Sequence, residues 1–310
     1  MIMSQKLHVL IKKVLYFLQY KFYLIINKIL NISISKSMFL LFDNKNQEII
    51  FIRYIFGALT IVGNHKSYKI EINRNSLAKE IFNREYIKNN YAEIYDILLP
   101  LKIKRKFGFI FLESNTVQNI CQLDFKLSYE YVRRVFEKNM LRSVNVNYFN
   151  NILESIKLIS RTDDEFNILK KIFTKVFEME KYLAPSHGDF HIRNILKNED
   201  RYYLIDLDCF KRFQFIWMDE IYFVIELIVF EKKNINWLEV VKQIVIDGRI
   251  LIKYKEYFNH FNFENPYAQL LIYLLDRIEQ EKKHTNYNLD NIYKIIDLII
   301  GRINDTKYNI

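Results

Sequence analysis

Few residues in this chain interrupt regular secondary structure: it contains 6 Gly and 3 Pro among 310 residues. This content excludes collagen-like chains and Gly/Pro-rich linkers, and no internal repeat is visible. The only 2 Cys, Cys121 and Cys209, are too far apart to match a common metal-binding spacing. Two distant Cys are typical of a reducing compartment, so we expect a cytoplasmic protein rather than a disulfide-stabilised secreted one.

Long uncharged hydrophobic runs are also missing. The longest candidate, residues 221–230, is interrupted by Glu226 and is shorter than the roughly 20 residues that a membrane-spanning helix needs. It is therefore interpreted as a buried helix. No segment resembles a secretory signal with a small-residue cleavage site. Hydrophobic residues make up 50% and charged residues 26%, which is typical of a folded globular protein.

Acidic residues are absent from the first 42 positions, whose six Lys carry +6 of the net charge of +10. Within this segment, residues 7–30 have apolar side chains at helical spacing and Lys on roughly the opposite arc. We predict an amphipathic helix in an extension over residues 1–37. Two interpretations remain open: its apolar face packs on the protein, or residues 1–30 make weak contact with the inner membrane face. The rest of the chain is only mildly basic and has no nucleic-acid-reading motif, which argues against nucleic acid as a partner.

Residues 38–115 are rich in β-branched and aromatic side chains. Strand-like runs separated by polar turns occur at 39–43, 48–57, 58–63, 67–73, 101–106 and 108–114. Between them, residues 76–90 have helical periodicity, with Asn75 or Ser76 as the N-cap. We predict a small antiparallel sheet with one inserted helix.

Residues 116–310 are predicted to be mainly helical. Thr162 and Glu165 form a capping-box pattern at the start of one helix, which Pro185 is expected to end, and helices resume near residue 219. A chain with its sheet first and its helices later predicts an α+β fold. We expect a small β-rich N-terminal lobe over 38–115 and a larger, mainly helical lobe over 116–310.

The most informative segment, residues 186–208, reads SHGDFHIRNILKNEDRYYLIDLD. Two short strand-like runs flank a polar turn and predict a hairpin centred on Asp200. Asn194 and Asp206 are equally distant from that centre, so the hairpin would bring them to the same end. Their oxygens suit Mg²⁺, and Asp189 in the preceding loop can face the same point. A carboxylate at the end of an apolar strand is costly unless paired or metal-bound, which argues against an ordinary polar hairpin.

This segment resembles the H-G-D-x-x-x-x-N and I-D-x-D motifs of the aminoglycoside phosphotransferase and choline kinase superfamily, relatives of protein kinases. The matching residues are His187, Gly188, Asp189, Asn194, Ile205, Asp206 and Asp208, with His191 as a frequent second histidine. The resemblance implies a two-lobed protein-kinase-like fold and phosphoryl transfer from ATP or GTP with Mg²⁺. It makes Asp189 the catalytic residue that accepts or orients the acceptor hydroxyl. Asn194 and Asp206 become metal ligands, Asp208 a second-metal or loop-shaping residue, and His187 a supporting residue.

A kinase-like smaller lobe also needs a cation for the nucleotide phosphates and a carboxylate that holds it. Lys69 is the candidate cation, with Lys66 as the second choice. At about 100° per residue, Glu85 falls near the middle of the predicted apolar arc of the inserted helix, and Glu80 falls well outside it. A carboxylate on an apolar face needs a cationic partner, so we predict a Lys69–Glu85 pair.

Four further features extend the resemblance or depart from it. The strand containing Glu113 resembles the strand that leads to the adenine site, so this stretch is predicted to contact the nucleotide. No G-x-G-x-x-G motif occurs; Gly57 and Gly63 alone lie between strand-like runs. Asp219 resembles a later aspartate that supports the catalytic loop, and fits a helix N-terminal carboxylate equally well. Arg193 replaces a usually small residue and is expected to face solvent.

The acceptor and several alternative functions remain open. We predict an acceptor hydroxyl on a sugar or choline-like headgroup, used in cell-surface glycan assembly. A net positive charge does not suit polycationic aminoglycosides, and an aminoglycoside-modifying enzyme is the first alternative. A glycosyltransferase using Asp206 and Asp208 as a metal-binding Asp-x-Asp is the second, although its chain would alternate strands and helices. A non-catalytic pseudokinase is the third, although every expected polar position is filled.

Overall fold

The computed structural model describes residues 49–55, 58–63, 65–71, 77–106, 109–115, 118–119, 124–140, 146–180, 182–264, 266–282 and 289–305. The predicted helix at 7–30, its membrane contact and the run at 39–43 lie outside these residues. Among the helices that are described, none is both long enough and apolar enough to cross a membrane.

Two compact units make up the chain. We call Met1–Ile81 with Leu99–Val117 the sheet unit, and Phe82–Leu98 with Gln118–Ile310 the helical unit. The second boundary lies close to the expected one at residue 115. We expected residues 82–98 in the smaller lobe, but they belong to the helical unit.

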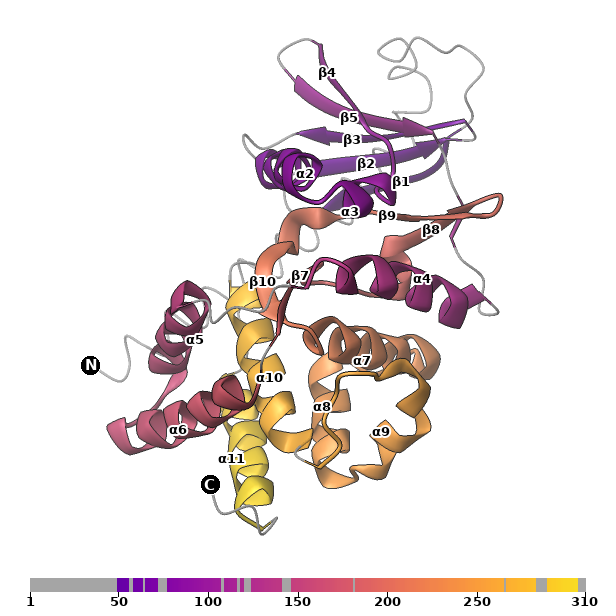
Figure 1. Cartoon of the computed structure of the whole chain (residues 1–310). Helices are drawn as coiled ribbons and strands as arrows, with labels where there is room; N and C mark the ends of the chain where they lie inside the picture. Colours follow the sequence, from indigo (N-terminus) through magenta and orange to yellow (C-terminus); the bar gives the residue numbers. More distant parts are fainter. Residues whose placement is uncertain are drawn as a thin grey trace, which may run out of the picture. The chain divides into compact units, whose positions relative to one another are not determined.

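The sheet unit contains a five-stranded antiparallel sheet with the strand order β1-β2-β3-β5-β4 (Figure 1). Its strands are β1 (Ile49–Ile55), β2 (Ala58–Gly63), β3 (Lys66–Glu71), β4 (Lys102–Lys106) and β5 (Phe109–Asn115). The β-branched and aromatic runs predicted these strands to within about two residues. At the edge of the sheet, β4 exposes Lys102, Lys104 and Arg105, and such charges discourage pairing with another chain.

Helix α2 (Ala78–Asn90) buries a different face from the one expected. Its buried positions, together with the turn before it, are Leu77, Glu80, Asn83 and Ile87. At about 100° per residue, the arc through these positions is centred near Glu80 and leaves Glu85 outside. The expectation was wrong because it counted Phe82 as a core residue, and the Phe82 side chain is 57% exposed.

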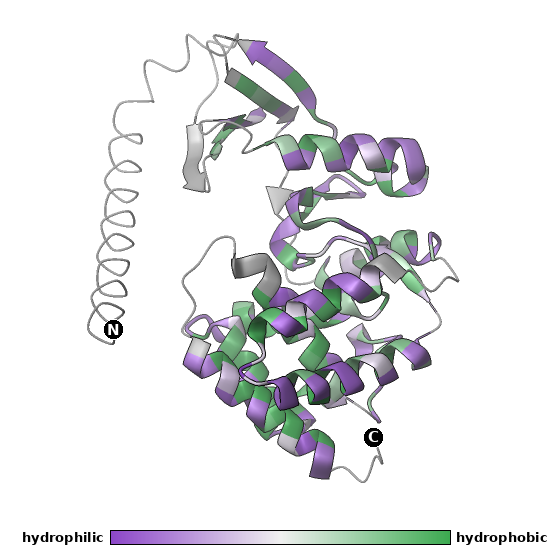
Figure 2. Ribbon diagram, turned by 90° about the vertical axis from the view of Figure 1, so that its left-hand side faces the viewer, coloured by the Kyte–Doolittle hydropathy of each residue, from purple (hydrophilic) through white to green (hydrophobic). Residues whose placement is uncertain are grey.

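Helices dominate the helical unit and turn their hydrophobic faces toward one another (Figure 2). They are α3 (Ala92–Asp96), α4 (Phe125–Glu137), α5 (Val146–Ile159), α6 (Asp163–Met179), α7 (Met218–Lys232), α8 (Trp237–Ile246), α9 (Arg249–Lys253), α10 (Pro266–Lys282) and α11 (Leu289–Asp305). One hydrophobic cluster joins α5, α6, α7, α8, α10 and α11. Helix α7 is buried along most of its length, as its apolar sequence predicts.

The start of α6 shows the predicted capping pattern with one change. The Thr162 hydroxyl accepts a hydrogen bond from the Glu165 backbone N–H at 3.1 Å. The Glu165 carboxylate reaches the N–H of Arg161, one residue before the N-cap, rather than that of Thr162 itself. Helix α6 ends at Met179, so Pro185 does not end it and lies instead in strand β7 (Leu183–Ser186).

The predicted hairpin is formed by β8 (Ile195–Asn198) and β9 (Arg201–Leu204). On its other side, β8 pairs with the short strand β6 (Gln118–Asn119). Ile195 pairs with Leu204, so the turn is centred between residues 199 and 200. A backbone hydrogen bond from Ile205 to Asn194, at 3.0 Å, continues the ladder. Asn194 therefore lies opposite Ile205, one residue short of the predicted Asp206, and both oxygen-bearing residues remain at the same end of the hairpin.

Candidate active site

The loop before the hairpin passes through a backbone conformation that only glycine adopts easily. Gly188 has φ of +76°, and a Cβ atom placed on it would lie 2.0 Å from the carbonyl oxygen of Cys209. Both the left-handed conformation and the close approach of a second backbone segment require a residue without a side chain. The glycine of the H-G-D motif therefore sets the path of the chain into Asp189.

Asp219, near the start of α7, holds this loop from one side. Its carboxylate accepts hydrogen bonds from the Ser186 hydroxyl at 2.8 Å and from the backbone N–H groups of His187 at 2.9 Å and Gly188 at 3.2 Å. Burial raises the pKa of Asp219, and the effects of His187 and of these hydrogen bonds offset only part of the rise. Asp219 also lies in the first turn of its helix, so the supporting and the helix-terminal interpretations both describe its position.

His187 ties the loop to the end of the hairpin. Its side chain is fully buried, and its Nδ1 accepts the Asp189 backbone N–H at 3.4 Å. The other ring nitrogen, Nε2, therefore carries the hydrogen and donates to the Ile205 carbonyl at 2.8 Å. The ring links Asp189 to the backbone immediately before Asp206.

The Asp189 side chain is partly exposed, at 30%, and its carboxylate lies beside His191 and Arg277. Oδ2 lies 3.5 Å from His191 Nε2, and Oδ1 lies 3.4 Å from the Arg277 guanidinium. Burial raises the pKa of Asp189, but the hydrogen bond and charge of His191 and the charge of Arg277 outweigh it and lower the pKa to about 2. The group is therefore ionised at neutral pH.

Of the residues predicted to bind metal, Asn194 contacts the Asp189 backbone, and Asp206 and Asp208 lie near each other. The buried Asn194 side chain donates from Nδ2 to the Asp189 carbonyl at 2.9 Å. Carboxylate oxygens of Asp206 and Asp208 lie within 4.8 Å of one another. Asp206 adopts the left-handed conformation, with φ of 62° and ψ of 67°, which turns the chain sharply after β9. Arg193 is exposed, as expected.

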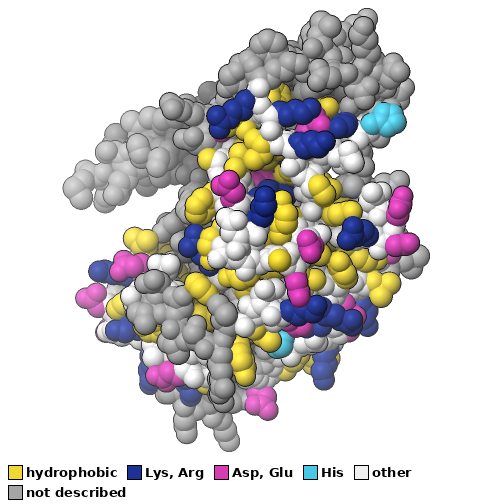
Figure 3. Space-filling view, turned by 45° about the horizontal axis from the view of Figure 1, so that its top comes forward, with side chains coloured by type: hydrophobic (Ala, Val, Ile, Leu, Met, Phe, Trp, Pro, Cys, Tyr) yellow, Lys and Arg dark blue, Asp and Glu magenta, His cyan; other side chains and the backbone are white. Residues whose placement is uncertain are grey.

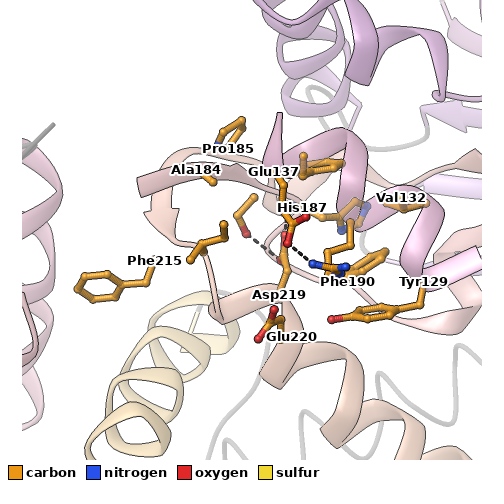
Figure 4. A pocket seen from close by; sticks show the side chains of 14 residues that line it. Tyr129, Val132, Glu137, Ala184, Pro185, His187, Phe190, Phe215, Asp219 and Glu220 are labelled. Carbon is orange, nitrogen blue, oxygen red and sulfur yellow. Dashed lines mark hydrogen bonds and ion pairs between the residues drawn. The ribbon is translucent and has the colours of Figure 1, made fainter. Parts of the chain in front are cut away.

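Asp219 also lines a small cavity, together with His187, Glu220, Glu137 and other residues (Figure 4). The buried Glu220 carboxylate accepts backbone N–H groups from three consecutive residues, Asn259, His260 and Phe261, at 3.1 to 3.2 Å. Burial raises the pKa of Glu220 to about 7, against the opposing effects of His260 and of these hydrogen bonds. The cavity has room for about one water molecule.

In the sheet unit, Lys69 pairs with Glu80 and not with Glu85. Lys69 Nζ lies 2.8 Å from Glu80 Oε2, and the Glu80 side chain is only 3% exposed. Glu85 is exposed. The predicted Lys69–Glu85 pair is therefore wrong, because the buried arc of α2 is centred on Glu80.

Glu113 in β5 is held by two lysines of the same sheet. Lys66 Nζ lies 2.7 Å and Lys104 Nζ lies 2.6 Å from its carboxylate oxygens. Burial alone would raise the pKa of Glu113, but the two ammonium groups lower it below its usual value. Lys and Arg side chains gather over this unit in the space-filling view (Figure 3).

The sequence reasoning missed Arg277, Glu137 and His260. Arg277 follows the apolar run of α10 directly, after the fully buried Asp276. Adjacent opposite charges on a buried helix were the available signal, but nothing in the sequence links them to Asp189, 88 positions away. Glu137 and His260 come from α4 and from the segment before α10, and their contact at 2.7 Å depends on the tertiary fold.

Comparison with known proteins reveals similarity in structure only. No protein-family model and no curated protein sequence matches the chain. A thermostable mutant of the aminoglycoside phosphotransferase APH(4)-Ia in its apo form is similar at 11% identity and a TM-score of 0.50, over 88% of this chain and 100% of that one. Its ternary complex with ADP and hygromycin B gives 11% identity and a TM-score of 0.50, over 90% of this chain and 100% of that one.

A choline kinase, LicA from Streptococcus pneumoniae, is similar at 12% identity and a TM-score of 0.49, over 86% of this chain and 98% of that one. The two APH(4)-Ia structures confirm the predicted fold. The chain has their α+β, protein-kinase-like fold, with an antiparallel sheet in its N-terminal part and helices in its C-terminal part.

Proposed function

We propose that this chain is a phosphotransferase that moves the γ-phosphate of ATP or GTP to a hydroxyl group of a small-molecule acceptor. The observation that supports this most is that Asp189 has an accessible carboxylate on a backbone held in place by other side chains. Its carboxylate is accessible, Asn194 holds its carbonyl, and Asp219 holds the two residues before it. The shared fold agrees with the proposal.

Asp189 receives the acceptor hydroxyl in this mechanism. With its pKa at about 2 it is ionised, so it accepts a hydrogen bond from the hydroxyl and points the oxygen toward the phosphate. Such a weak base suffices, because the transferring phosphoryl group passes through a loose transition state and positioning dominates the rate. Contacts with His191 and Arg277 fix the direction of the carboxylate.

The residues at the end of the hairpin fit Mg²⁺. Two carboxylates whose oxygens lie within 4.8 Å, those of Asp206 and Asp208, form the hard, anionic donor set that this ion prefers. The Asn194 amide donates through its nitrogen, which leaves its oxygen as the ligand atom. The ion would supply charge neutralisation for the nucleotide phosphates.

In the sheet unit, we propose that Lys69 binds the nucleotide phosphates and that Glu80, rather than Glu85, positions it. An ammonium has three donor hydrogens and the Lys69 side chain is 25% exposed, so a phosphate oxygen can join Glu80 as an acceptor. The carboxylate of Glu113 is engaged by two lysines. We therefore propose that the backbone of β5 near Glu113, rather than its side chain, contacts the adenine.

The proposed acceptor is a sugar or a choline-like headgroup in cell-surface glycan assembly. The net charge of +10 supports an uncharged or anionic glycan over a polycation. The basic segment 1–30 would suit a cytoplasmic enzyme at the inner membrane face.

The structure bears differently on two alternative functions. An aminoglycoside-modifying activity has the fold in its favour, since the similar structures are aminoglycoside phosphotransferases. A glycosyltransferase would show strands alternating with helices in a parallel sheet. In the described residues, all the paired strands are antiparallel, which argues against it.

Calorimetry with ATP, with and without Mg²⁺, tests the nucleotide and metal assignments. We expect Mg²⁺ to strengthen ATP binding by the intact protein and to have little effect on Asp206→Ala. ATP consumption with sugars, choline, lipid-linked glycans and aminoglycosides then tests the transfer. A folded protein that binds no nucleotide would leave the pseudokinase interpretation.

A further inference from the structure

Arg277, on helix α10, brings a positive charge directly to Asp189. Its guanidinium lies 3.4 Å from Asp189 Oδ1 and 3.1 Å from Glu226 Oε1 on helix α7. Only 12% of the Arg277 side chain is exposed. A guanidinium is charged at every working pH, so one permanent cation is held between two carboxylates at the candidate acceptor position.

Two aromatic rings complete this surrounding. The guanidinium carbon lies 5.2 Å from the ring centre of Tyr222 and 5.4 Å from that of Trp237. Both distances fall within the range in which a cation is attracted to a ring face. Aromatic faces combined with carboxylates are the chemistry that binds ammonium groups, and here a side chain of the protein takes that place.

The position of Arg277 is fixed by its neighbour in the helix. Asp276 is fully buried and accepts hydrogen bonds from Gln214 Nε2 at 3.0 Å and from the Tyr222 hydroxyl at 3.1 Å, and it also contacts Lys211. Moving this part of α10 would leave a buried carboxylate without these donors, which is costly. Arg277 is therefore held in its cage by the helix as well as by its own contacts.

We propose that Arg277 is a built-in cation that occupies the ammonium position beside Asp189 and restricts the enzyme to acceptors without a positive charge next to the reacting hydroxyl. This specificity rests on the proposed phosphotransfer. An amine or quaternary ammonium would compete for the same rings and carboxylates and would be repelled by the guanidinium. An uncharged polyol does not compete with Arg277 for the rings and carboxylates and is not repelled by its charge. Its hydroxyl oxygens can accept hydrogen bonds from the guanidinium. The inference selects sugar-type acceptors over choline and aminoglycosides.

Choline and its uncharged isostere 3,3-dimethyl-1-butanol are matched probes for this site. Calorimetry should show that the intact protein binds choline no more tightly than the isostere. Arg277→Ala should bind choline at least about tenfold more tightly than the intact protein does, since a cage of this kind contributes about that factor. Arg212→Ala is the matched control, because Arg212 stacks on the Tyr86 ring at 3.8 Å; it should change neither affinity.

Arg277→Lys keeps the charge and should keep the selectivity of the intact protein, and thermal unfolding checks that each variant is folded. Preferential choline binding by the intact protein would overturn the inference, as would unchanged choline affinity in a folded Arg277→Ala. A gain of choline affinity in Arg277→Lys as large as in Arg277→Ala would also contradict it.

These binding measurements need no nucleotide, so they separate the two proposals. If choline affinity rises in Arg277→Ala while no acceptor is phosphorylated, the cation cage stands and the phosphotransfer proposal fails. If the intact protein phosphorylates choline or a kanamycin-type acceptor with a higher kcat/KM than uncharged sugars, phosphotransfer stands and the cage inference fails.

Discussion

The sheet unit and the helical unit hold their buried carboxylates in different ways. In the sheet unit, Glu80 and Glu113 contact lysine ammonium groups. In the helical unit, Asp219 and Glu220 accept backbone N–H groups. A lysine has a flexible stem and can turn toward a ligand phosphate, whereas a backbone N–H cannot leave without moving the chain. The first arrangement suits ligand binding, and the second fixes a loop.

The pKa values show the same contrast. Two ammonium groups lower the pKa of Glu113 in spite of its burial. Burial raises the pKa of Asp219, and it raises that of Glu220 to about 7, because backbone donors compensate only part of the desolvation. If this contrast is correct, substitutions in the helical unit should mainly cost stability and turnover, and those in the sheet unit should mainly cost nucleotide affinity.

The largest effect is expected for Gly188→Ala. The new Cβ would overlap the Cys209 carbonyl oxygen, which is backbone and cannot move aside cheaply, and φ would remain positive. We expect a loss of more than about 3 kcal/mol in the free energy of unfolding, measured by urea denaturation. Gly301→Ala is the control, since nothing lies within 4 Å of its Cβ position. Equal stability of the two variants would refute the tight loop geometry.

Asp219→Ala should cost about 2–4 kcal/mol of stability, because it leaves buried N–H donors without an acceptor. Turnover should also fall by at least about 10²-fold as the loop before Asp189 loosens. Asp164→Ala is a matched control at the second position of helix α6. The free energy of unfolding of Asp164→Ala should fall by no more than the roughly 1 kcal/mol expected for a helix-terminal charge. Similar losses for both would mean that Asp219 acts only through the helix dipole.

Lys69→Met should raise the KM for ATP by about tenfold or more and cost about 1–3 kcal/mol of stability, because buried Glu80 loses a partner. A double-mutant cycle with Glu80→Gln on both quantities should show strong coupling. The same cycle with Glu85→Gln should be additive to within about 0.5 kcal/mol, since Glu85 is exposed. Coupling to Glu85 instead would restore the pair that the sequence suggested.

The smallest effect concerns pH. The hydrogen bond to Glu137 raises the pKa of His260 above 6.5. A raised pKa adds stability that is fully present below the unfolded pKa and is lost as pH rises through the folded one. The stability difference between the intact protein and His260→Gln should therefore be larger at pH 5.5 than at pH 8. Thermal unfolding across this range checks it, and a difference that grows with pH would contradict it.

Local patterns in the sequence were sufficient for much of the fold. The strands of the sheet unit follow β-branched runs, and the hairpin after Asp189 was misplaced by one residue because its turn has no fixed centre until the ladder forms. The face of α2 was predicted wrongly because an apolar residue, Phe82, is exposed and a charged one, Glu80, is buried. Periodicity assumes the opposite in both cases.

The candidate site shows where sequence reasoning stops. The motif residues from His187 to Asp208 are close in sequence, so their neighbourhood could be inferred. Arg277 and Glu226 reach Asp189 from helices α10 and α7, and their contact depends on how those helices pack. The charges within these apolar helices are visible in the sequence, but no local pattern says which distant residue each of them contacts.

Turnover of Asp189→Ala decides whether this carboxylate receives the acceptor hydroxyl. Transfer of labelled γ-phosphate from ATP to uncharged sugars would be measured for the intact protein and the variant, with ATP affinity and thermal unfolding as controls. We expect transfer by the intact protein, a loss of at least about 10²-fold in kcat for Asp189→Ala, and a change in ATP affinity of less than about threefold. Near-native turnover by a folded Asp189→Ala protein would contradict it.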